Sequence, residues 1–486
     1  MLNTRFISKM LGAMFLLETA FMLVPAAVAM ACGEDDAGVF GVSSAVLFGA
    51  GLLLYLYGRH ADERQAGYRE GMLTVTLTWA LLSLLGMLPF YLGGYIDNVT
   101  DAYFETMSGF TTTGASVIAD VESLPRGILL WRSLTQWQGG IGVVVFTVAL
   151  MPLFGGGASQ MFEAETTGRG ITHERFRPRV TQVAKRFSGI YLLLTLLLTL
   201  LLSAGGMSVF DAVNHALTTV STGGYSTRNA GIGFWDSAII EYTIAFFMLT
   251  GSVSMTLLYF AFKGDVRRLL GDEELRWFVF IIAFFVAVTA AWIMSGGWVS
   301  GWAEAVRKAV FHVISIISST GFATSDYLLW GSFFHMNALI LMFIGGCTGS
   351  TSGGLKAGRF VIIHKNLSNV FLKQMHPNAV LPVRMNGRSV SPDNVYRCLA
   401  FTFVYLSLIA AGSMALTLDG AGLEGAIGAS LSAISNIGPG LAGQGPSGNY
   451  ASMPCLSKWT LSFLMMAGRL ELFTVITIFI PGFWKR

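Results

Sequence analysis

Four short polar runs along this chain each contain a glycine, and each follows an amphipathic, apolar stretch. The runs are FTTTGAS with Gly114, TVSTGGYS with Gly223, ISSTGFATS with Gly321 and ISNIGPG with Gly438. Backbone carbonyls and hydroxyls are the groups that replace the water around an alkali cation in a selectivity filter. One such run is most often a Ser/Thr-rich turn. Four in the same register predict a ring of cation ligands around one axis.

Backbone geometry gives a separate reason for a glycine in each run. To aim successive carbonyls at one axis, the backbone must adopt strained or positive φ angles, which glycine does at little cost. The glycines recur in the chain at roughly 100-residue intervals, enough for two membrane helices and a re-entrant segment in each repeat. The run ISNIGPG departs most from the others, because Asn436 and Ile437 stand where hydroxyl residues stand elsewhere. This inequality predicts weaker selectivity than four equal copies would give.

The elements that position these runs are membrane helices. Hydrophobic residues make up 53% of the 486 residues and charged residues 12%, and the mean hydropathy is +0.61. This composition excludes an ordinary soluble domain and predicts an all-α integral membrane protein. We expect about ten spans of about 20 residues each, at 7–31, 39–58, 71–95, 127–153, 187–205, 234–262, 275–296, 328–363, 394–417 and 456–484.

The first span could also be a signal peptide, since Arg5 and Lys9 precede a long apolar run that ends in small residues and Cys32. Its apolar part exceeds the usual length of a signal and contains Glu18, so we expect a retained helix. The four cysteines are scattered and indicate neither a metal site nor a disulfide framework.

Basic residues gather in three of the loops, at 169–186, 263–276 and 365–397, and at both ends of the chain. The positive-inside rule places this side, with both termini, in the cytoplasm. The net charge of +3 therefore reflects topology and does not indicate nucleic-acid binding.

The helices fall into two leading spans and four copies of one hairpin. We expect boundaries at 1–69 for the leading pair, then repeats at 70–168, 169–270, 271–385 and 386–486. Each repeat reads as helix, half-membrane pore helix, polar run and second helix. The pore helices are predicted near 99–110, 208–219, 302–317 and 421–434. Several of them begin with acids near the amino end, which suits a helix dipole whose negative end faces a cation at mid-membrane; examples are Asp101, Glu105, Asp211 and Glu304.

These runs, in this arrangement, resemble the Trk/Ktr/HKT superfamily of potassium transport proteins, most closely its bacterial TrkH/TrkG subunits, over essentially the whole chain. The resemblance implies four parallel repeats in a pseudo-fourfold arrangement around one pore, preceded by two helices. It also implies a potassium filter, because Gly114 stands where sodium-transporting members carry serine. The implied filter residues are Thr112, Thr113, Gly114, Ser221, Thr222, Gly223, Ser319, Thr320, Gly321, Asn436, Ile437 and Gly438.

A glycine-rich break is predicted within 333–363, which as a single helix would be longer than a bilayer core is thick. Its middle reads GGCTGSTSGG, and each glycine costs about 1 kcal/mol in a helix. Small residues for close helix packing are the plain interpretation. The resemblance instead implies a gate below the filter, formed with an arginine from the last span; its residues are Gly345, Gly346, Gly349, Gly353, Gly354, Lys356 and Arg469.

Arg469 within the last span needs water or a partner, and Glu241 is one candidate carboxylate. Two functions remain open. In one, a gated channel-like pore takes up potassium across the bacterial inner membrane under a cytoplasmic regulatory subunit. In the other, a symporter couples potassium to protons or sodium through Glu241 or Glu471. Parallel repeats favour the pore, since secondary transporters usually have inverted repeats.

An enzyme is not expected, because no HExxH or GxSxG motif is present. His215 and His312, near the outer halves of pore helices, are expected to be packed. No nucleotide-binding motif appears, so we expect no cofactor on this chain beyond potassium as substrate and filter-bound ion. The resemblance implies a homodimer and a cytoplasmic TrkA-type ring that binds nucleotides and NAD(H) and docks on the basic loops, although topology alone explains those charges.

Overall fold

The computed structural model describes residues 2–61, 67–150 and 180–484, without the side chains of 143–150 and 180–183. The chain is predominantly helical, with one hairpin of two-residue antiparallel strands among the described residues. The basic loop around 169–179 and the boundary expected at 168/169 lie outside the described residues, as do Lys485 and Arg486.

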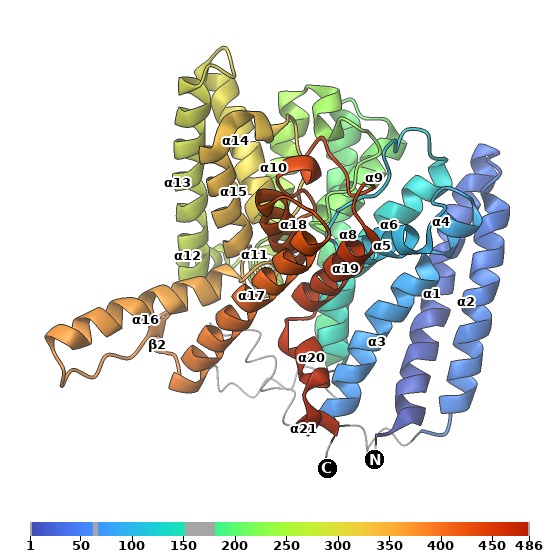
Figure 1. The fold of residues 1–486 in the computed structure, drawn as a ribbon, viewed down its shortest axis with the longest axis horizontal. Coiled ribbons are helices and arrows are strands. Elements are labelled where there is room, and N and C mark those ends of the chain that lie inside the picture. The colour runs from blue at the N-terminus through green and yellow to red at the C-terminus, as the bar shows by residue number, and fades with distance from the viewer. Residues whose placement is uncertain (1, 62–66, 151–179, 485–486) are drawn as a thin grey trace.

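Two leading helices stand at one side of the molecule (Figure 1). They are α1 (Thr4–Cys32) and α2 (Ala37–Gly58). They pack closely: a Cβ built on Gly12 would lie 2.4 Å from the backbone nitrogen of Tyr55, and one on Gly58 would lie 2.4 Å from the carbonyl oxygen of Arg5. Helix α1 covers the span expected at 7–31 and packs along α2.

The remaining elements follow in four groups. The first holds α3 (Tyr68–Gly86), α4 (Leu88–Leu92), α5 (Val99–Phe110) and α6 (Arg126–Leu150). The second holds α8 (Val180–Ala204), α9 (Val209–Val220), η3 (Gly231–Trp235), α10 (Ala238–Gly251), α11 (Met255–Phe262) and α12 (Val266–Gly271). The third holds α13 (Glu273–Ser295), α14 (Trp302–Ile317), η4 (Tyr327–Trp330), α15 (Gly331–Ile344), α16 (Ala357–Met375), β1 (Arg384–Met385) and β2 (Arg388–Ser389). The fourth holds α17 (Pro392–Leu418), α18 (Leu423–Ser435), η5 (Ala442–Gln444), α19 (Cys455–Arg469), α20 (Phe473–Ile476), η6 (Thr477–Phe479) and α21 (Pro481–Trp484).

Within the described residues, seven helices are long and apolar enough to span a membrane, or up to nine if each of two bent pairs is one span. They correspond to all of the expected spans except 127–153, which is the 25-residue helix α6. The bent pairs are α10 with α11, at 108°, and α19 with the elements after it, at 112°. Neither bend was expected from the sequence.

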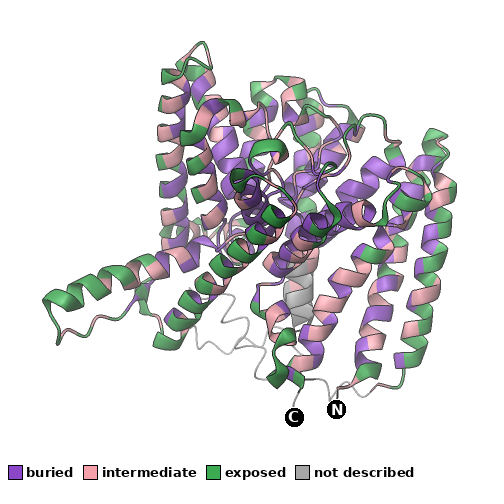
Figure 2. Cartoon of the chain, in the orientation of Figure 1, coloured by how far each residue is buried: buried purple, intermediate pink, exposed green. Residues whose placement is uncertain are grey.

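The expected span 328–363 is wrong as one crossing. Helix α15 ends at Ile344 and α16 begins at Ala357. Helix α16 leaves the bundle at its lower edge, and its outer surface is largely exposed (Figures 1 and 2). The physical reason is the glycine-rich segment between them, which breaks the helix as expected but also redirects it.

Four short helices, α5, α9, α14 and α18, each end in a run of buried residues, and purple residues fill the interior of the molecule in Figure 2. Their bounds agree with the predicted pore helices to within two residues. Each packs against the helices before and after it in its own group, and against one helix of the group before it in cyclic order: α5 on α19, α9 on α6, α14 on α10 and α18 on α15. The visible ends of α1 and α21 lie at the same end of the molecule (Figure 1).

Candidate cation-binding ring and glycine loop

Each short helix ends in the same turn. The residue at its end has a left-handed φ of 54–56°, although none of these residues is glycine; they are Thr112, Thr222, Ser319 and Asn436. The N–H of the next residue donates to the carbonyl five residues back, at 2.8–3.0 Å, as in a Schellman motif. A non-glycine residue costs about 1–2 kcal/mol in this conformation. The surrounding structure must hold it there in all four copies.

Two residues further on, each segment has a glycine with positive φ, at 79–99°; these are Gly114, Gly224, Gly321 and Gly438. The register predicted for the second copy is therefore wrong by one residue. Gly224, and not Gly223, corresponds to Gly114. Gly223 stands instead at the position of Thr113, because Gln136 fills the space of its missing side chain: a Cβ there would lie 2.4 Å from the Gln136 side-chain Cδ.

The four glycines join the segments into a closed ring. A Cβ on Gly114 would lie 2.1 Å from the carbonyl oxygen of Gly223, and one on Gly224 would lie 1.9 Å from that of Thr320. Likewise, a Cβ on Gly321 would lie 1.9 Å from the carbonyl oxygen of Ile437, and one on Gly438 would lie 2.6 Å from that of Thr113 in the first segment. Any side chain at these glycines would displace a carbonyl of the next segment.

The ring therefore brings together segments that are far apart in sequence, including all twelve residues predicted for the filter. Their eight non-glycine side chains are at most 1% exposed. The carbonyl oxygens of Thr113, Thr320 and Ile437 accept no hydrogen bond from any described residue, whereas that of Gly223 accepts one from Gln136. Buried carbonyls are almost always paired. Unpaired carbonyls on three segments of one ring are suited to an alkali cation, which bonds to oxygen alone.

Side-chain bonds differ among the segments. Thr111 and Thr113 share a hydroxyl bond of 2.8 Å, and Ser318 and Thr320 share the equivalent bond of 2.8 Å. In the fourth segment, the Asn436 amide donates to Thr113 Oγ1 at 3.0 Å, which links the last segment to the first. Asn436, which replaces the hydroxyl residue of the other segments, thus helps to close the ring. The sequence did not indicate this role.

The predicted break beside the ring is confirmed. Residues 345–356, the glycine loop, connect α15 to α16, and Gly345, Gly349 and Gly354 have φ of 71–80°. The loop is bonded to the ring, because Gly353 N donates to Ser319 Oγ at 2.7 Å. A Cβ on Gly353 would lie 1.9 Å from Ser435 O. The bend between α10 and α11 also holds the loop, through Cys347 N to Ser252 O at 2.9 Å.

Two cationic side chains lie in or against the loop. Arg469, 5% exposed, donates to the carbonyls of Thr351 and of Gly139, the latter at 2.9 Å. Glu241, the candidate carboxylate named for it, lies instead 3.6 Å from Arg307 Nε. Carbonyl oxygens of the glycine loop and of helix α6 take the place of a carboxylate. Lys356 Nζ donates to the carbonyl of Ser352 within the loop.

The predicted histidines are packed, as expected. His215 Nδ1 is 2.7 Å from Asp211 O and its Nε2 is 3.0 Å from Ser226 Oγ. His312 Nε2 is 3.2 Å from Ser325 O. Outside the spans, the amide of Asn229 donates to Asp120 at 2.7 Å and lowers the pKa of that exposed carboxyl. These bonds fasten the loops that follow the ring segments.

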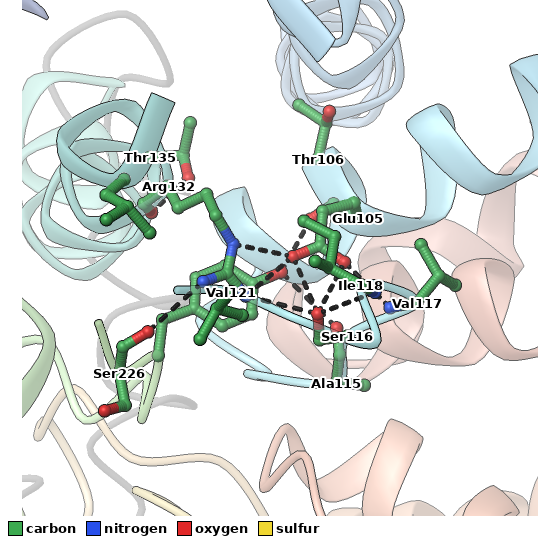
Figure 3. Close-up of polar contacts among 12 residues, drawn as sticks. Glu105, Thr106, Ala115, Ser116, Val117, Ile118, Val121, Arg132, Thr135 and Ser226 are labelled. Atoms are coloured by element: carbon green, nitrogen blue, oxygen red, sulfur yellow. Dashed lines mark hydrogen bonds and ion pairs between the residues drawn. The ribbon is translucent and has the colours of Figure 1, made fainter. Parts of the chain in front are cut away.

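Sequence reasoning missed an ion pair behind the ring (Figure 3). Glu105 of α5 accepts from Arg132 of α6 at 2.9 Å, and their side chains are 0% and 3% exposed. The sequence contains a signal for this pair, because an arginine within an apolar span has a polar partner or faces water. The same reasoning predicted a partner for Arg469 but was not extended to Arg132. Arg359, which pairs with Glu471 at 2.6 Å, was also missed.

Comparison with known proteins decides the family. A family model described as TrkH, cation transport protein, matches residues 43–486. The chain belongs to this family. It is 35% identical to the Trk system potassium uptake protein TrkH of Halomonas elongata and 32% identical to that of Escherichia coli K12, with complete coverage of both chains in each case. The crystal structure of the potassium transporter TrkH from Vibrio parahaemolyticus matches with a TM-score of 0.89 and 31% identity over 99% of each chain.

Membership of this family, together with the apolar helices, makes the chain a multi-pass membrane protein of the Trk potassium-uptake type. The TrkG protein of Escherichia coli K12 is also similar, at 31% identity over 99% of each chain. All of these relatives are named as transport proteins rather than enzymes. The expectation drawn from the polar runs is therefore confirmed at the level of family.

Proposed function

We propose that this chain takes up potassium across the bacterial inner membrane through a gated, potassium-selective, channel-like pore. The observation that carries the proposal is the ring: four glycines each contact a carbonyl of the next segment, and three of those carbonyls are buried without a hydrogen bond from the described residues. Such oxygens can replace the water of a cation. The name of each relative adds potassium as the transported ion of that relative.

A pseudo-fourfold arrangement of parallel repeats around one pore, after two leading helices, is part of the proposal. The cyclic packing of α5, α9, α14 and α18 on helices of the preceding group supports it. So do the equal φ angles at the end of each short helix. The repeat boundaries proposed are 70–168, 169–270, 271–385 and 386–486, with 1–69 as the leading pair.

The glycine loop with Lys356 and Arg469 is proposed as the gate. Its bonds to Ser319 of the ring and to Ser252 of a bent helix support this role, because movement of the loop breaks both contacts. Two positive charges beside a cation path raise the energy of a passing cation. Opening is proposed to depend on a cytoplasmic TrkA-type ring that binds nucleotides and NAD(H), docked on a homodimer with cytoplasmic termini. No cofactor is proposed for this chain itself.

Coupled symport through Glu241 or Glu471 is less well supported. Both carboxylates already have a cationic neighbour: Glu241 lies near Arg307 at 3.6 Å, and Glu471 pairs with Arg359 at 2.6 Å. A carrier carboxylate that exchanges protons would have to be released from its partner in each cycle. Neutral variants of both residues should therefore keep conducting with a reversal potential set by potassium.

Reconstitution in liposomes tests the proposal. We expect potassium and rubidium flux well above sodium flux for the unmodified protein, and relatively more sodium flux for Gly114→Ser. Serine at this position meets the carbonyl of Gly223, at 2.1 Å from its Cβ, and a strained φ of 83°. Gly420→Ser is the matched control, since φ there is 91° but nothing lies within 4 Å. Equal sodium and potassium flux through the unmodified protein would refute the proposed selectivity.

A further inference from the structure

Helix α6 presents two polar side chains, Arg132 and Gln136, one helical turn apart, toward the first and second ring segments. Both are buried, at 2% and 0% exposure. Side chains four residues apart lie on the same face of a helix. They meet the ring where the first segment adjoins the second. At this place the second segment has Gly223, whereas the other three segments have a residue with a side chain.

Gln136 is fixed at both ends of its amide. Its Nε2 donates to Gly223 O at 2.7 Å, and its Oε1 accepts from Tyr225 N at 3.0 Å. Its side chain fills the space that a side chain on Gly223 would need. In the first and third segments, this position holds Thr113 and Thr320. The Gln136 amide thus takes the place of a threonine hydroxyl in the second segment.

Arg132 holds the same part of α6 against both segments (Figure 3). It donates to Glu105 through Nε at 2.9 Å and to Ser116 Oγ through Nη2 at 3.2 Å, on the first segment's side. It also donates to Ser226 O at 3.3 Å and lies 4.1 Å above the ring of Tyr225, on the second segment's side. The distance from the α6 backbone to the Gly223 carbonyl is therefore set by several contacts.

We infer that Gln136 is a positioning residue that determines cation discrimination by holding the Gly223 carbonyl in the ring. The inference rests on the proposed function. Gly223 O is the one carbonyl of its layer that has a hydrogen-bond donor among the described residues. Selectivity depends on the number and field strength of the carbonyls around the ion. The bond fixes the direction of this carbonyl and draws electron density away from the cation.

A reciprocal exchange of side chains tests the inference. Gly223 is not among the positive-φ residues, and the three atoms nearest to a Cβ built there all belong to the Gln136 side chain. In a Gln136→Ala background, Gly223→Thr would recreate the arrangement of the first and third segments, with Ser221 in the place of Thr111 and Ser318. Potassium, rubidium and sodium flux would be measured in liposomes for Gln136→Ala, Gly223→Thr and the double variant.

We expect Gln136→Ala to lower the potassium-to-sodium permeability ratio about fivefold, the effect of one net hydrogen bond on one of two ions. Gly223→Thr alone should lose flux because of the clash, and the double variant should recover both flux and most of the selectivity. Gln138→Ala is the control: it removes a second buried amide of α6, which lies beside Glu18 instead of the ring, and it should leave the permeability ratio unchanged.

An unchanged ratio in Gln136→Ala, with normal selectivity of the unmodified protein, would overturn this inference and leave the proposed function intact. A double variant no better than Gly223→Thr would also overturn it. If Gln136→Ala cannot be purified as a folded protein, recovery of selective flux in the double variant is the deciding result. Absence of potassium selectivity in the unmodified protein would refute the proposed function itself.

Discussion

Threonine, serine and asparagine in left-handed backbone conformation are the feature that distinguishes the ring from ordinary helix ends. Such residues persist only where neighbouring groups fix them, and they gather at functional sites. Here the fixing bonds are visible: Asn436 donates to Met465 O at 2.9 Å, and Ser319 accepts from the glycine loop at 2.7 Å. A glycine would relax the backbone but would remove the bonds that define the position of the ring.

The pair formed by Glu105 and Arg132 provides a prediction for stability. Glu105→Gln keeps the shape of the side chain but leaves Arg132, 2% exposed, without a counter-charge. Breaking a buried pair from one side costs about 3–5 kcal/mol. We expect a lower thermal midpoint of the purified protein for Glu105→Gln. The variant that also carries Arg132→Met should regain much of the loss, because no unpaired charge remains.

This explanation would be contradicted if the stability loss of the double variant equalled the sum of the losses of Glu105→Gln and Arg132→Met. Such a result would mean that the two side chains act independently, despite the 2.9 Å between their charged atoms.

At the scale of elements, hydropathy and amphipathic patterning predicted the position of all four short helices. The patterns work because a short helix between apolar spans must bury one face and end in a polar run. They failed at the bends near Ser252 and Leu470, and at the departure of α16. A window of hydropathy contains no information on the direction of a helix, and α16 is less apolar than α15 before it. Only the glycines of 345–354 revealed one of the three breaks.

Gly353→Ala tests the glycine loop. The new Cβ would lie 1.9 Å from Ser435 O, so the loop must move away from the ring. If the loop closes the pore, this variant should show greater potassium flux without any added regulatory subunit. Gly349→Ala is the matched control, since its φ of 75° strains alanine while its nearest neighbour, Ser254 Oγ, is 3.4 Å away. Equal flux in the two variants would show that loop strain, and not displacement from the ring, controls conduction.

At the scale of the molecule, the ring closes through contacts between the two ends of the chain. Tyr450 N donates to Ser116 O at 2.9 Å, and Tyr450 Oη donates to Gly438 O at 2.8 Å. The first of these bonds joins residues more than 300 positions apart, so neither periodicity nor spacing predicts it. The one-residue shift at Gly223 has the same origin. It depends on Gln136 from another segment, whereas the sequence pattern TGG offers two equivalent glycines.

Substitution of Lys458 tests whether contacts between the two ends of the chain hold the ring closed. The ammonium group of Lys458 pairs with Asp101 of the first short helix at 2.6 Å and donates to Ala451 O at 2.8 Å, and its side chain is 4% exposed. Lys458→Met should destabilise the protein by about 2 kcal/mol, through the loss of charge-assisted hydrogen bonds. Because Asp101 lies in the first turn of α5, the helix that leads into the first ring segment, the potassium-to-sodium permeability ratio should fall as well.

Lys308→Met is the matched control for closure. This lysine also pairs with an acid on a short helix, Glu304, at 3.0 Å, but the pair lies within α14 and its side chains are 21% and 33% exposed. Pairs of this kind contribute about 0.3–0.5 kcal/mol. Thermal unfolding and liposome flux should therefore change clearly for Lys458→Met and little for Lys308→Met. Equal effects of the two substitutions would mean that the bond between Lys458 and Asp101 adds nothing to ring closure beyond what a local ion pair contributes.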